Sequence, residues 1–239
     1  SGRAWQWRGD ERFPMCSTFK FLLAAQVLHA VDQGKESLDA RVHYERAALV
    51  DYSPVTEPHA GQDGMTVREL CEAAVTLSDN TAANLLLAQH GGPAGFTRFV
   101  RGLGDRQTRL DRIEPAMSES RPGDVRDTTT PQAMLASLRE VALGDALSPA
   151  SRRQVLDWLL ACKTGDKTLR AGAPGWTVGD KTGSGAGTRN DVGLLWRPGG
   201  GVAAKPVLVT SYLTETRAQP AARDAALASV AREVVRLLG

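Results

Sequence analysis

The sequence lacks the features that mark membrane proteins and nucleic-acid-binding proteins. No uninterrupted apolar stretch approaches the roughly 20 residues that a membrane span needs, and no signal peptide is recognisable at the start. Neither sign of charge dominates, because 29 Lys and Arg stand against 27 Asp and Glu, and the basic residues are scattered. We therefore expect neither a membrane nor a nucleic acid as a partner.

Cysteine and histidine are also scarce. The cysteines are Cys16, Cys71 and Cys162, which form neither a metal-spaced cluster nor an even disulfide set. The histidines are His29, His43, His59 and His90, and none has the spacing of a zinc protease. The sequence therefore predicts no metal and no cofactor.

The remaining composition fits a globular α/β protein. The 239 residues are 42% hydrophobic, which is enough for a sizeable core in one or two domains. Strand-like segments are expected near the two ends of the chain, at residues 1–12, 176–183, 191–196 and 207–214. Helical patterns are expected at residues 17–34, 66–74, 81–89, 95–103, 130–143, 148–161 and 218–238. This order predicts an antiparallel sheet built from both termini and flanked by helices, with an inserted all-helical domain.

We accordingly expect two domains. The sheet domain comprises residues 1–16 together with 165–239, and the helical domain comprises residues 17–164. The active site is expected in the cleft between them.

Ser17 and Lys20 lie at the start of an apolar helical pattern. Because they are three residues apart, they share one helix face. A hydroxyl at the positive end of a helix, with a lysine one turn away, fits an activated nucleophile. The same residues also fit a helix cap followed by a solvated lysine.

Ser78, Asp79 and Asn80 form a polar turn between two apolar segments. One interpretation is an N-terminal cap for the helix that follows. The other is a second hydroxyl that carries protons, beside an amide that binds a carbonyl or amide group of a substrate.

Lys181, Thr182 and Gly183 end an expected strand and are followed by small residues. A substrate can lie along such a strand edge, and the backbone N–H of Ser184 could point into an oxyanion hole. The same letters at residues 163–165 follow a helix and precede charged residues, so we reject that copy. The glycine-rich run 183–187 lacks the full nucleotide-binding fingerprint.

The stretch from 104 to 129 is polar and too long for an ordinary connection. Glu114 lies within it, and by default it would be a solvated carboxylate. An ion pair between Arg112 and Asp127 would close residues 112–127 into an omega-type loop that holds Glu114 inward.

These motifs, in this order and spacing, resemble those of class A serine β-lactamases, from about Trp5 to the terminal helix. The resemblance implies that Ser17 is the acylated nucleophile, Lys20 its neighbouring base and Glu114 the activator of the hydrolytic water. It implies a proton shuttle at Ser78 and a substrate-amide contact at Asn80. The residues implied for the substrate carboxylate are Lys181, Thr182, Ser184 and Arg189.

The resemblance also implies an oxyanion hole formed by the backbone N–H groups of Ser17 and Ser184, and an aromatic residue, Tyr52, at the cleft entrance. Whether Lys20 or Glu114 is the acylation base stays open. The implied function is hydrolysis of β-lactam antibiotics, conferring resistance, by a monomer in the periplasm or outside the cell. The nearest alternative is a penicillin-binding transpeptidase or sensor, and a more distant one is a non-catalytic binding module.

The chain departs from the family pattern at several positions. Ser118 stands where an asparagine usually helps to hold the hydrolytic water, and the turn after Gly185 looks one residue short, which affects the placement of Arg189. Arg223 is the next candidate if Arg189 lies outside the site. Cys71 and Cys16 match positions that are disulfide-bonded in some members, but the partner positions are Ala24 and Gly185, so no bond is expected.

The family usually begins with a helix and strand before the position of Ser1, so the chain is expected to be truncated at its N-terminus. In the terminal helix, the residues expected to pack on the sheet are Ala222, Ala226, Val230 and Val234.

Overall fold

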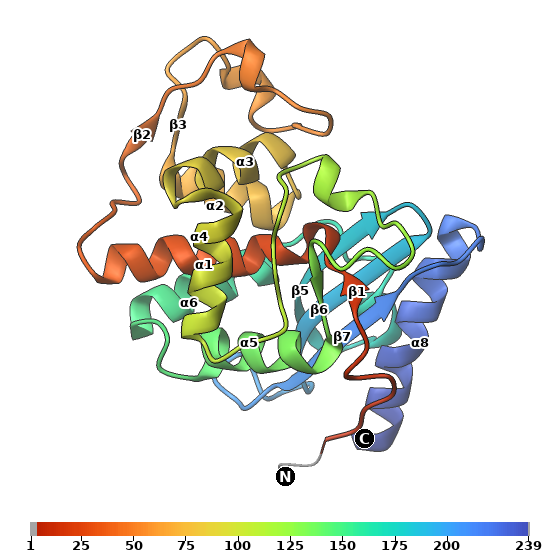
Figure 1. Ribbon diagram of the computed structural model, residues 1–239. Helices are drawn as coiled ribbons and strands as arrows, with labels where there is room; N and C mark the ends of the chain where they lie inside the picture. The colour runs from red at the N-terminus through yellow and green to blue at the C-terminus, as the bar shows by residue number, and fades with distance from the viewer. Residues whose placement is uncertain (1–3, 239) are drawn as a thin grey trace.

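The computed structural model describes residues 4–238 and has a three-stranded antiparallel sheet on one side (Figure 1). Strands β5 (Thr177–Gly185), β6 (Thr188–Trp196) and β7 (Val207–Leu213) lie in the order β5-β6-β7. A tight turn joins β5 to β6, which places Ser184 opposite Arg189. The three strands expected in the second half of the chain are confirmed.

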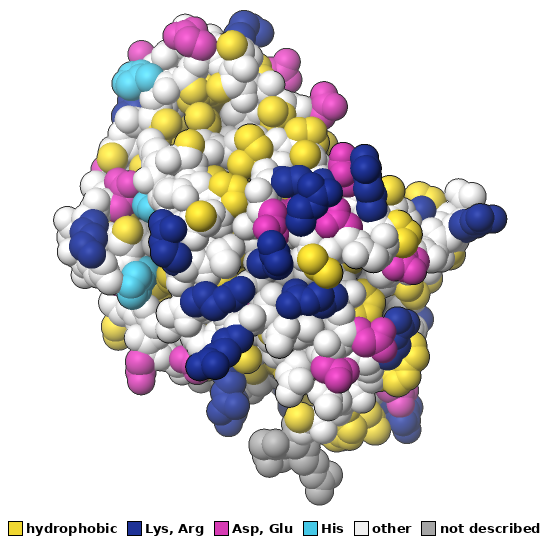
Figure 2. Space-filling view, viewed as in Figure 1, with side chains coloured by type: hydrophobic (Ala, Val, Ile, Leu, Met, Phe, Trp, Pro, Cys, Tyr) yellow, Lys and Arg dark blue, Asp and Glu magenta, His cyan; other side chains and the backbone are white. Residues whose placement is uncertain are grey.

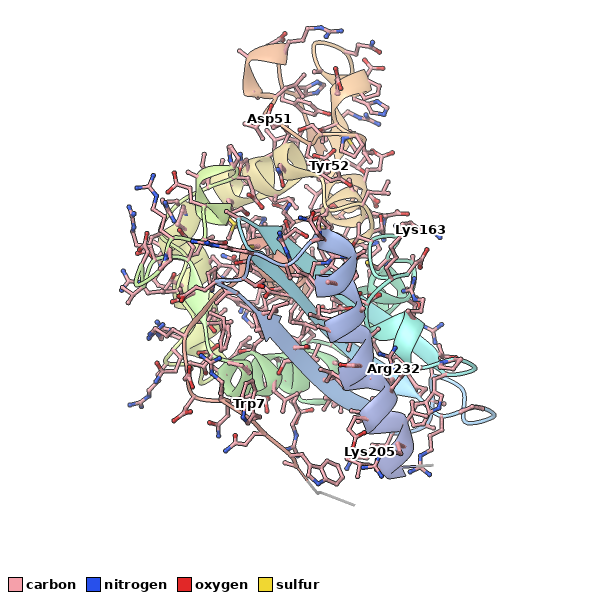
Figure 3. The ribbon with its side chains drawn as sticks, turned by 90° about the vertical axis from the view of Figure 1, so that its right-hand side faces the viewer. Trp7, Asp51, Tyr52, Lys163, Lys205 and Arg232 are labelled. Carbon is pink, nitrogen blue, oxygen red and sulfur yellow. The ribbon has the colours of Figure 1, made fainter. Side chains whose placement is uncertain are left out.

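Helices cover both faces of this sheet. Helices α7 (Leu169–Gly172) and α8 (Pro220–Leu238) pack together on one face. Helices α5 (Pro131–Leu143) and α6 (Pro149–Leu160) contact β7 and β5, respectively. Figure 3 shows α8 lying across the front of the sheet and α5 behind it. The expected α/β class is therefore confirmed.

The remaining long helices form the region beside the sheet. They are α1 (Phe19–Asp32), α2 (Val67–Thr76), α3 (Asn80–Gln89) and α4 (Gly92–Gly102). Helix α1 is apolar on nearly all sides and is buried from Phe19 to Ala25, so it forms the centre of the core. Helix α2 begins at the expected capping box, in which Thr66 and Glu69 each bond the other's backbone N–H.

The rest of the regular structure is short. Strand β1 (Phe13–Pro14) pairs with β4 (Thr128–Thr129), and β2 (Arg41–Val42) pairs with β3 (Met65–Thr66). The 3₁₀ helices are η1 (Cys16–Thr18), η2 (Arg46–Ala48), η3 (Glu57–His59) and η4 (Ala116–Ser118).

The strand expected over residues 1–12 is wrong for the described part, since residues 4–12 contain no strand and 1–3 lie outside the described residues. The first strand is β1, and it joins the end of the long loop instead of the main sheet. Pro14 has no N–H to donate to a ladder. Its carbonyl instead accepts a hydrogen bond from the Asn190 side chain on β6, at 2.8 Å.

The buried face of α8 also differs from the expectation. Leu227, Ala228 and Ala231 are buried, whereas Ala226 and Val230 are exposed. Close packing with α7 sets this rotation, because a Cβ atom at Gly172 would lie only 1.9 Å from the carbonyl oxygen of Ala228. Within residues 4–238, no helix combines the length and apolar character that crossing a membrane requires.

Candidate active site

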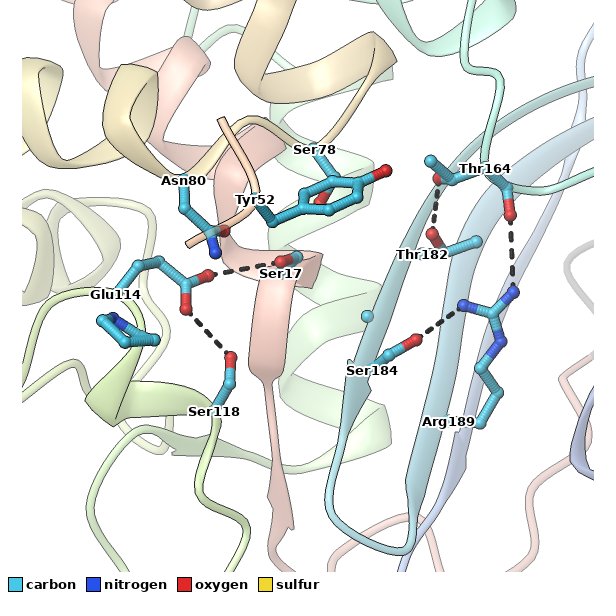
Figure 4. A pocket seen from close by; sticks show the side chains of 12 residues that line it. Ser17, Tyr52, Ser78, Asn80, Glu114, Ser118, Thr164, Thr182, Ser184 and Arg189 are labelled. Carbon is cyan, nitrogen blue, oxygen red and sulfur yellow. Dashed lines mark hydrogen bonds between the residues drawn. The ribbon is translucent and has the colours of Figure 1, made fainter. Parts of the chain in front are cut away.

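A hollow lies between strand β5 and the helical region. Its volume is about 390 Å³. Figure 4 shows Ser17 at its floor, with Glu114 and Ser118 on one side and Thr182, Ser184 and Arg189 on the other. The lining residues are Ser17, Tyr52, Ser78, Asn80, Glu114, Pro115, Ser118, Thr164, Thr182, Gly183, Ser184 and Arg189.

Ser17 lies in η1, at the positive end of α1, where the backbone is unusual. The preceding residue, Cys16, has a φ of +44°, a conformation that a non-glycine residue adopts only when the surroundings enforce it. Gly183 allows β5 to approach this turn, because a Cβ atom there would lie 2.7 Å from the Met15 oxygen and 3.2 Å from the Ser17 nitrogen. The Ser17 backbone therefore lies directly against the end of β5.

The hydroxyl of Ser17 donates a hydrogen bond to Glu114 Oε1 at 3.2 Å. Lys20 Nζ lies 3.2 Å from the same oxygen, and both charged side chains are buried. Lys20 also donates to the Ser78 carbonyl at 2.8 Å and to Asn80 Oδ1 at 2.6 Å. Burial lowers the pKa of Lys20, although the charge of Glu114 opposes this shift. The serine, lysine and carboxylate thus form one connected group, and the alternative of a solvated lysine is wrong.

The Ser78–Asn80 turn fits both of the interpretations that its sequence allowed. Asp79 is the N-cap of α3 and accepts from the Ala82 N–H at 2.8 Å. Ser78 has a φ of +62° and presents its hydroxyl to the cleft. The Asn80 backbone N–H donates to the Tyr52 carbonyl at 3.0 Å, which holds the Tyr52 backbone beside the turn, and the exposed Tyr52 side chain lines the hollow.

Lys181 extends from β5 beneath the cleft. Its Nζ donates to Ser78 Oγ at 3.0 Å and to the Thr182 carbonyl at 2.8 Å. Burial lowers the pKa of Lys181 to about 8. The lysine therefore links the Ser78 hydroxyl to the strand edge, and it is charged at neutral pH.

Arg189 lies within the cleft despite the short turn before it. Its Nη1 donates to Ser184 Oγ at 2.8 Å, and its Nε donates to Asp224 Oδ1 on α8 at 2.6 Å. Arg223, the fallback candidate, instead donates to the Ala218 carbonyl at 2.7 Å and does not line the cleft.

The loop that carries Glu114 is closed by the expected pair of charges. Arg112 Nε lies 2.6 Å from Asp127 Oδ2, while Asp127 Oδ1 accepts from the backbone N–H groups of residues 111 and 112. Ser118 Oγ donates to Glu114 Oε2 at 3.0 Å. Glu114 is therefore buried and hydrogen-bonded at both of its oxygens.

Sequence reasoning missed three contributors to this site. Asn84 on α3 holds the Glu114 backbone through two hydrogen bonds, of 2.9 and 3.0 Å. A signal existed, because Asn84 follows Asn80 by four residues on the same helix face. Asp224 and Thr164 also contact site residues, and no local pattern marks either one. Residues 163–165 repeat the Lys-Thr-Gly letters of residues 181–183. Lys163 is exposed and adds no second lysine to the cleft, but Thr164 lines it.

The cysteines and acidic groups form no other site in the described chain. Cys16, Cys71 and Cys162 are free and buried. Between residues 4 and 238, no group of three or more His, Cys, Asp and Glu side chains is placed to hold a metal ion. The fold and the half-buried serine beside a buried lysine and carboxylate define the class of protein: a serine hydrolase.

Comparisons with known proteins show the family of the chain. The family model described as "Beta-lactamase enzyme family" matches residues 1–238. β-Lactamase L2 of Stenotrophomonas maltophilia is 49% identical over 241 residues, covering 100% of this chain and 78% of the relative.

Solved structures agree with this match. A class A β-lactamase reconstructed as an ancestral protein is 63% identical, with a TM-score of 0.95 over 99% of this chain and 90% of that chain. Another, described as the last common ancestor of Gram-negative bacteria, is 62% identical, with a TM-score of 0.96 over 100% of this chain and 90% of that chain.

The chain belongs to the β-lactamase enzyme family, and its solved relatives are of class A. The resemblance indicated by the motifs is therefore confirmed. The enzyme is a hydrolase that acts on β-lactams, and its relatives do not favour the penicillin-binding alternative.

Proposed function

We propose that this enzyme opens the β-lactam ring through an acyl-enzyme on Ser17, which water directed by Glu114 then hydrolyses. One observation supports this above all: Glu114 receives hydrogen bonds from Ser17 at one oxygen and from Ser118 at the other. The same buried carboxylate can therefore reach the serine proton and a water held near Ser118.

In the acylation step, Ser17 Oγ attacks the lactam carbonyl carbon and its proton leaves. The hydrogen bond to Glu114 favours this carboxylate as the acceptor, while Lys20 stabilises it from within the site. The ring nitrogen gains a proton as the C–N bond breaks. Ser78 supplies that proton, because its hydroxyl faces the cleft and is replenished along the bond from Lys181. The step leaves Glu114 protonated and Lys181 neutral. Before deacylation Glu114 releases its proton to solvent and Lys181 regains one, so that the carboxylate can again accept a proton from the hydrolytic water.

The developing oxyanion needs fixed hydrogen-bond donors. We assign this role to the backbone N–H groups of Ser17 and Ser184, since the close approach at Gly183 sets the end of β5 against the Ser17 turn. Asn80 is assigned to the amide side chain of the substrate, and Tyr52 to the cleft entrance.

The substrate carboxylate is assigned to the opposite side of the cleft. Lys181, Thr182, Ser184 and Arg189 supply two positive charges and two hydroxyl groups there. This arrangement suits an anion the size of a carboxylate. The Arg112–Asp127 pair is assigned to closing the loop that carries Glu114.

The proposal also covers the domain division, the partner, the oligomeric state and the location of the protein. The cleft lies between a sheet domain, residues 1–16 and 165–239, and a helical domain, residues 17–164. Several Lys and Arg side chains cross the middle of the face in Figure 2, with Asp and Glu mainly above and below them. The chain has 29 Lys and Arg against 27 Asp and Glu, and this near balance supports a small-molecule partner over a nucleic acid. We propose a monomer that acts in the periplasm or outside the cell and confers antibiotic resistance, on the strength of its family membership.

Stopped-flow turnover of a chromogenic cephalosporin, with intact-mass detection of the protein, tests the proposal. We expect many turnovers per enzyme and a transient adduct that maps to Ser17. A stoichiometric burst followed by a persistent adduct would instead indicate a transpeptidase or sensor. Absence of both an adduct and turnover would indicate a binding module.

A further inference from the structure

Three groups that lie in a row behind the carboxylate side of the cleft are unexplained by the mechanism above. Cys162 Sγ lies 3.3 Å from Thr164 Oγ1, and Thr164 Oγ1 lies 2.5 Å from Thr182 Oγ1. Cys162 and Thr182 are buried, at 1% and 3% exposure, and Thr164 is half-buried. Figure 4 shows the Thr164 and Thr182 hydroxyls facing each other at the cleft wall.

The direction of the hydrogen bonds along this row matters for binding. A hydroxyl has only one proton to donate. If Thr182 donates to Thr164, it presents lone pairs to the cleft and repels a carboxylate. If Thr164 donates to Thr182, the Thr182 proton is free to point into the cleft.

The buried thiol decides between these two directions. Burial, and after it the charge of Asp180, raise the pKa of Cys162, so the group remains S–H at neutral pH. Thr164 Oγ1 is the hydrogen-bonding partner of this thiol within residues 4–238. A hydroxyl oxygen is a better acceptor than a thiol sulfur, so the thiol donates to Thr164. The Thr164 proton then needs an acceptor, and Thr182 Oγ1 lies 2.5 Å away, which favours donation from Thr164 to Thr182.

We propose that Cys162 and Thr164 form a hydrogen-bond relay that directs the Thr182 proton into the cleft and so strengthens binding of the substrate carboxylate. Thr164 is thus a positioning residue, and Cys162 sets the direction of the relay. This inference rests on the proposed function, because it concerns how the same site recognises the carboxylate.

A second contact supports the role of Thr164. Its backbone carbonyl accepts a hydrogen bond from Arg189 Nη2 at 3.4 Å. One residue therefore contacts both Thr182 and Arg189, which we assign to the carboxylate from two different strands. Arg189 bonds the carbonyl of Thr164, whereas Thr182 and Cys162 bond its hydroxyl, so the hydroxyl can be removed while the Arg189 contact stays in place.

The test compares a penicillin with its carboxylate methyl ester, which lacks the negative charge. The readout is the ratio of kcat/KM for the acid to kcat/KM for the ester. In Thr164→Val, which keeps the shape and the carbonyl but loses the hydroxyl, we expect this ratio to fall about tenfold, the size of one hydrogen bond to a charged group. Thr164→Ser should retain the parent ratio.

The thiol end has its own variants. Cys162→Ala should lower the ratio by about two- to threefold, since a thiol is a weak donor, whereas Cys162→Ser should retain it. Cys71→Ala, at another fully buried free thiol, controls for the effect of a cavity in the core.

An unchanged ratio in Thr164→Val, or an equal loss in Thr164→Ser, would overturn the relay while leaving the proposed function intact. If Thr164→Val does not fold, the two variants at Cys162 provide the test. Equal acid-to-ester ratios in Cys162→Ala and Cys162→Ser would overturn the relay. A parent enzyme that hydrolyses neither substrate would overturn the proposed function, and the relay with it.

Discussion

At the scale of single residues, the Arg189 guanidinium forms hydrogen bonds on two sides, toward the cleft and toward the terminal helix. It donates to Ser184 on one side and lies 2.6 Å from Asp224 on the other. Both charged side chains are 17% exposed, so part of the positive charge that a substrate carboxylate would meet is already neutralised.

Asp224→Asn should therefore increase the attraction of Arg189 for the carboxylate. We expect KM for a penicillin to fall by about two- to fivefold with little change in kcat, the effect of a partly exposed pair worth about 0.5–1 kcal/mol. Steady-state kinetics of parent and variant measure this. A raised KM would mean that Asp224 is needed to hold Arg189 in position.

Lys181 should make kcat/KM depend on pH in the alkaline range. Burial lowers the pKa of this lysine to about 8, so its ammonium is present below that pH and is lost above it. We expect kcat/KM for a carboxylate substrate to fall as the pH rises through about 8. At saturation kcat should fall less, because the bound carboxylate keeps the ammonium protonated.

Rate profiles from about pH 7 to about pH 9.5 test this expectation. A kcat/KM that stays flat across that range would show that Lys181 remains charged, or that its charge does not contribute to binding.

Sequence motifs singled out five residues that the fold brings together, and the catalytic roles assigned to them stay predictions. Ser17, Lys20, Ser78, Lys181 and Glu114 line or underlie one cleft. Thr164 and Asp224 could not be predicted in the same way. Each reaches the site because of how α7, α8 and β5 pack in space, and packing of that kind leaves no local pattern.

At the scale of elements, the loop over residues 112–127 depends on Asp127. This side chain is 1% exposed and has an ion pair with Arg112 as well as two backbone N–H donors. Removal of Arg112 leaves a buried carboxylate without its counter-charge.

We therefore expect Arg112→Ala to lower the free energy of unfolding by about 2–4 kcal/mol and to slow deacylation, because Glu114 loses its fixed position. Urea denaturation and single-turnover kinetics measure the two effects. Arg121→Ala is the matched control, since the Arg121 side chain is 69% exposed and pairs only with a neighbouring loop residue. Equal free energies of unfolding for the two variants would contradict the role of the Arg112–Asp127 ion pair.

Strands β5 and β6 carry a pair of buried acidic residues, Asp180 and Asp191. One oxygen of Asp180 accepts from Arg170 at 2.7 Å, and one oxygen of Asp191 accepts from Thr168 at 2.5 Å. The other oxygen of each is buried and has no hydrogen-bond partner among residues 4–238. Burial raises the pKa of both, and the charge of Asp191 adds to the rise at Asp180.

A carboxyl group whose pKa is raised in the folded state binds a proton more tightly there than in the unfolded chain. Its contribution to stability is therefore largest at low pH and declines as the pH rises from about 4 through the raised pKa. Asp191→Asn should lessen this decline, because its amide can still accept from Thr168 and can donate to Asp180.

We expect this variant to gain about 1 kcal/mol relative to the parent at pH 8 and less at pH 5. Urea denaturation at both pH values checks it. An equal loss of stability at the two pH values would show that the amide does not fit beside the Asp180 carboxylate.

Most helix and strand boundaries were predictable because caps and periodicity act locally. Thr66 with Glu69 starts α2 as expected, whereas α4 begins at Gly92, before the expected start at residue 95. The partner of β1 and the buried face of α8 were predicted wrongly. Both depend on contacts with distant segments, namely the loop strand β4 and the glycine of α7.

At the scale of the whole molecule, the cleft draws on segments that are far apart in the chain. Ser17 comes from the start of α1, Glu114 from the long loop and Thr182 from β5, so no isolated fragment contains the site. The order of helices and strands correctly predicted an α/β fold with a cleft beside the sheet. The division into two domains at residues 16 and 164 stays a prediction.

The central claim is that Glu114 directs the water that clears the Ser17 acyl-enzyme. In Glu114→Gln, the amide keeps the shape of the side chain but cannot accept a proton. Because Glu114 also accepts the Ser17 proton in the proposed acylation step, we expect acylation to slow but to remain measurable. Hydrolysis of the adduct should slow by about 10²- to 10⁴-fold, the usual contribution of a general base. Ser17→Ala should form no adduct at all.

Intact mass spectrometry at a series of times after addition of a penicillin is the most direct measurement. The account predicts that the parent returns to its unmodified mass within the mixing time, while Glu114→Gln retains the mass of one opened penicillin for minutes or longer. A Glu114→Gln variant that clears its adduct as quickly as the parent would contradict the account.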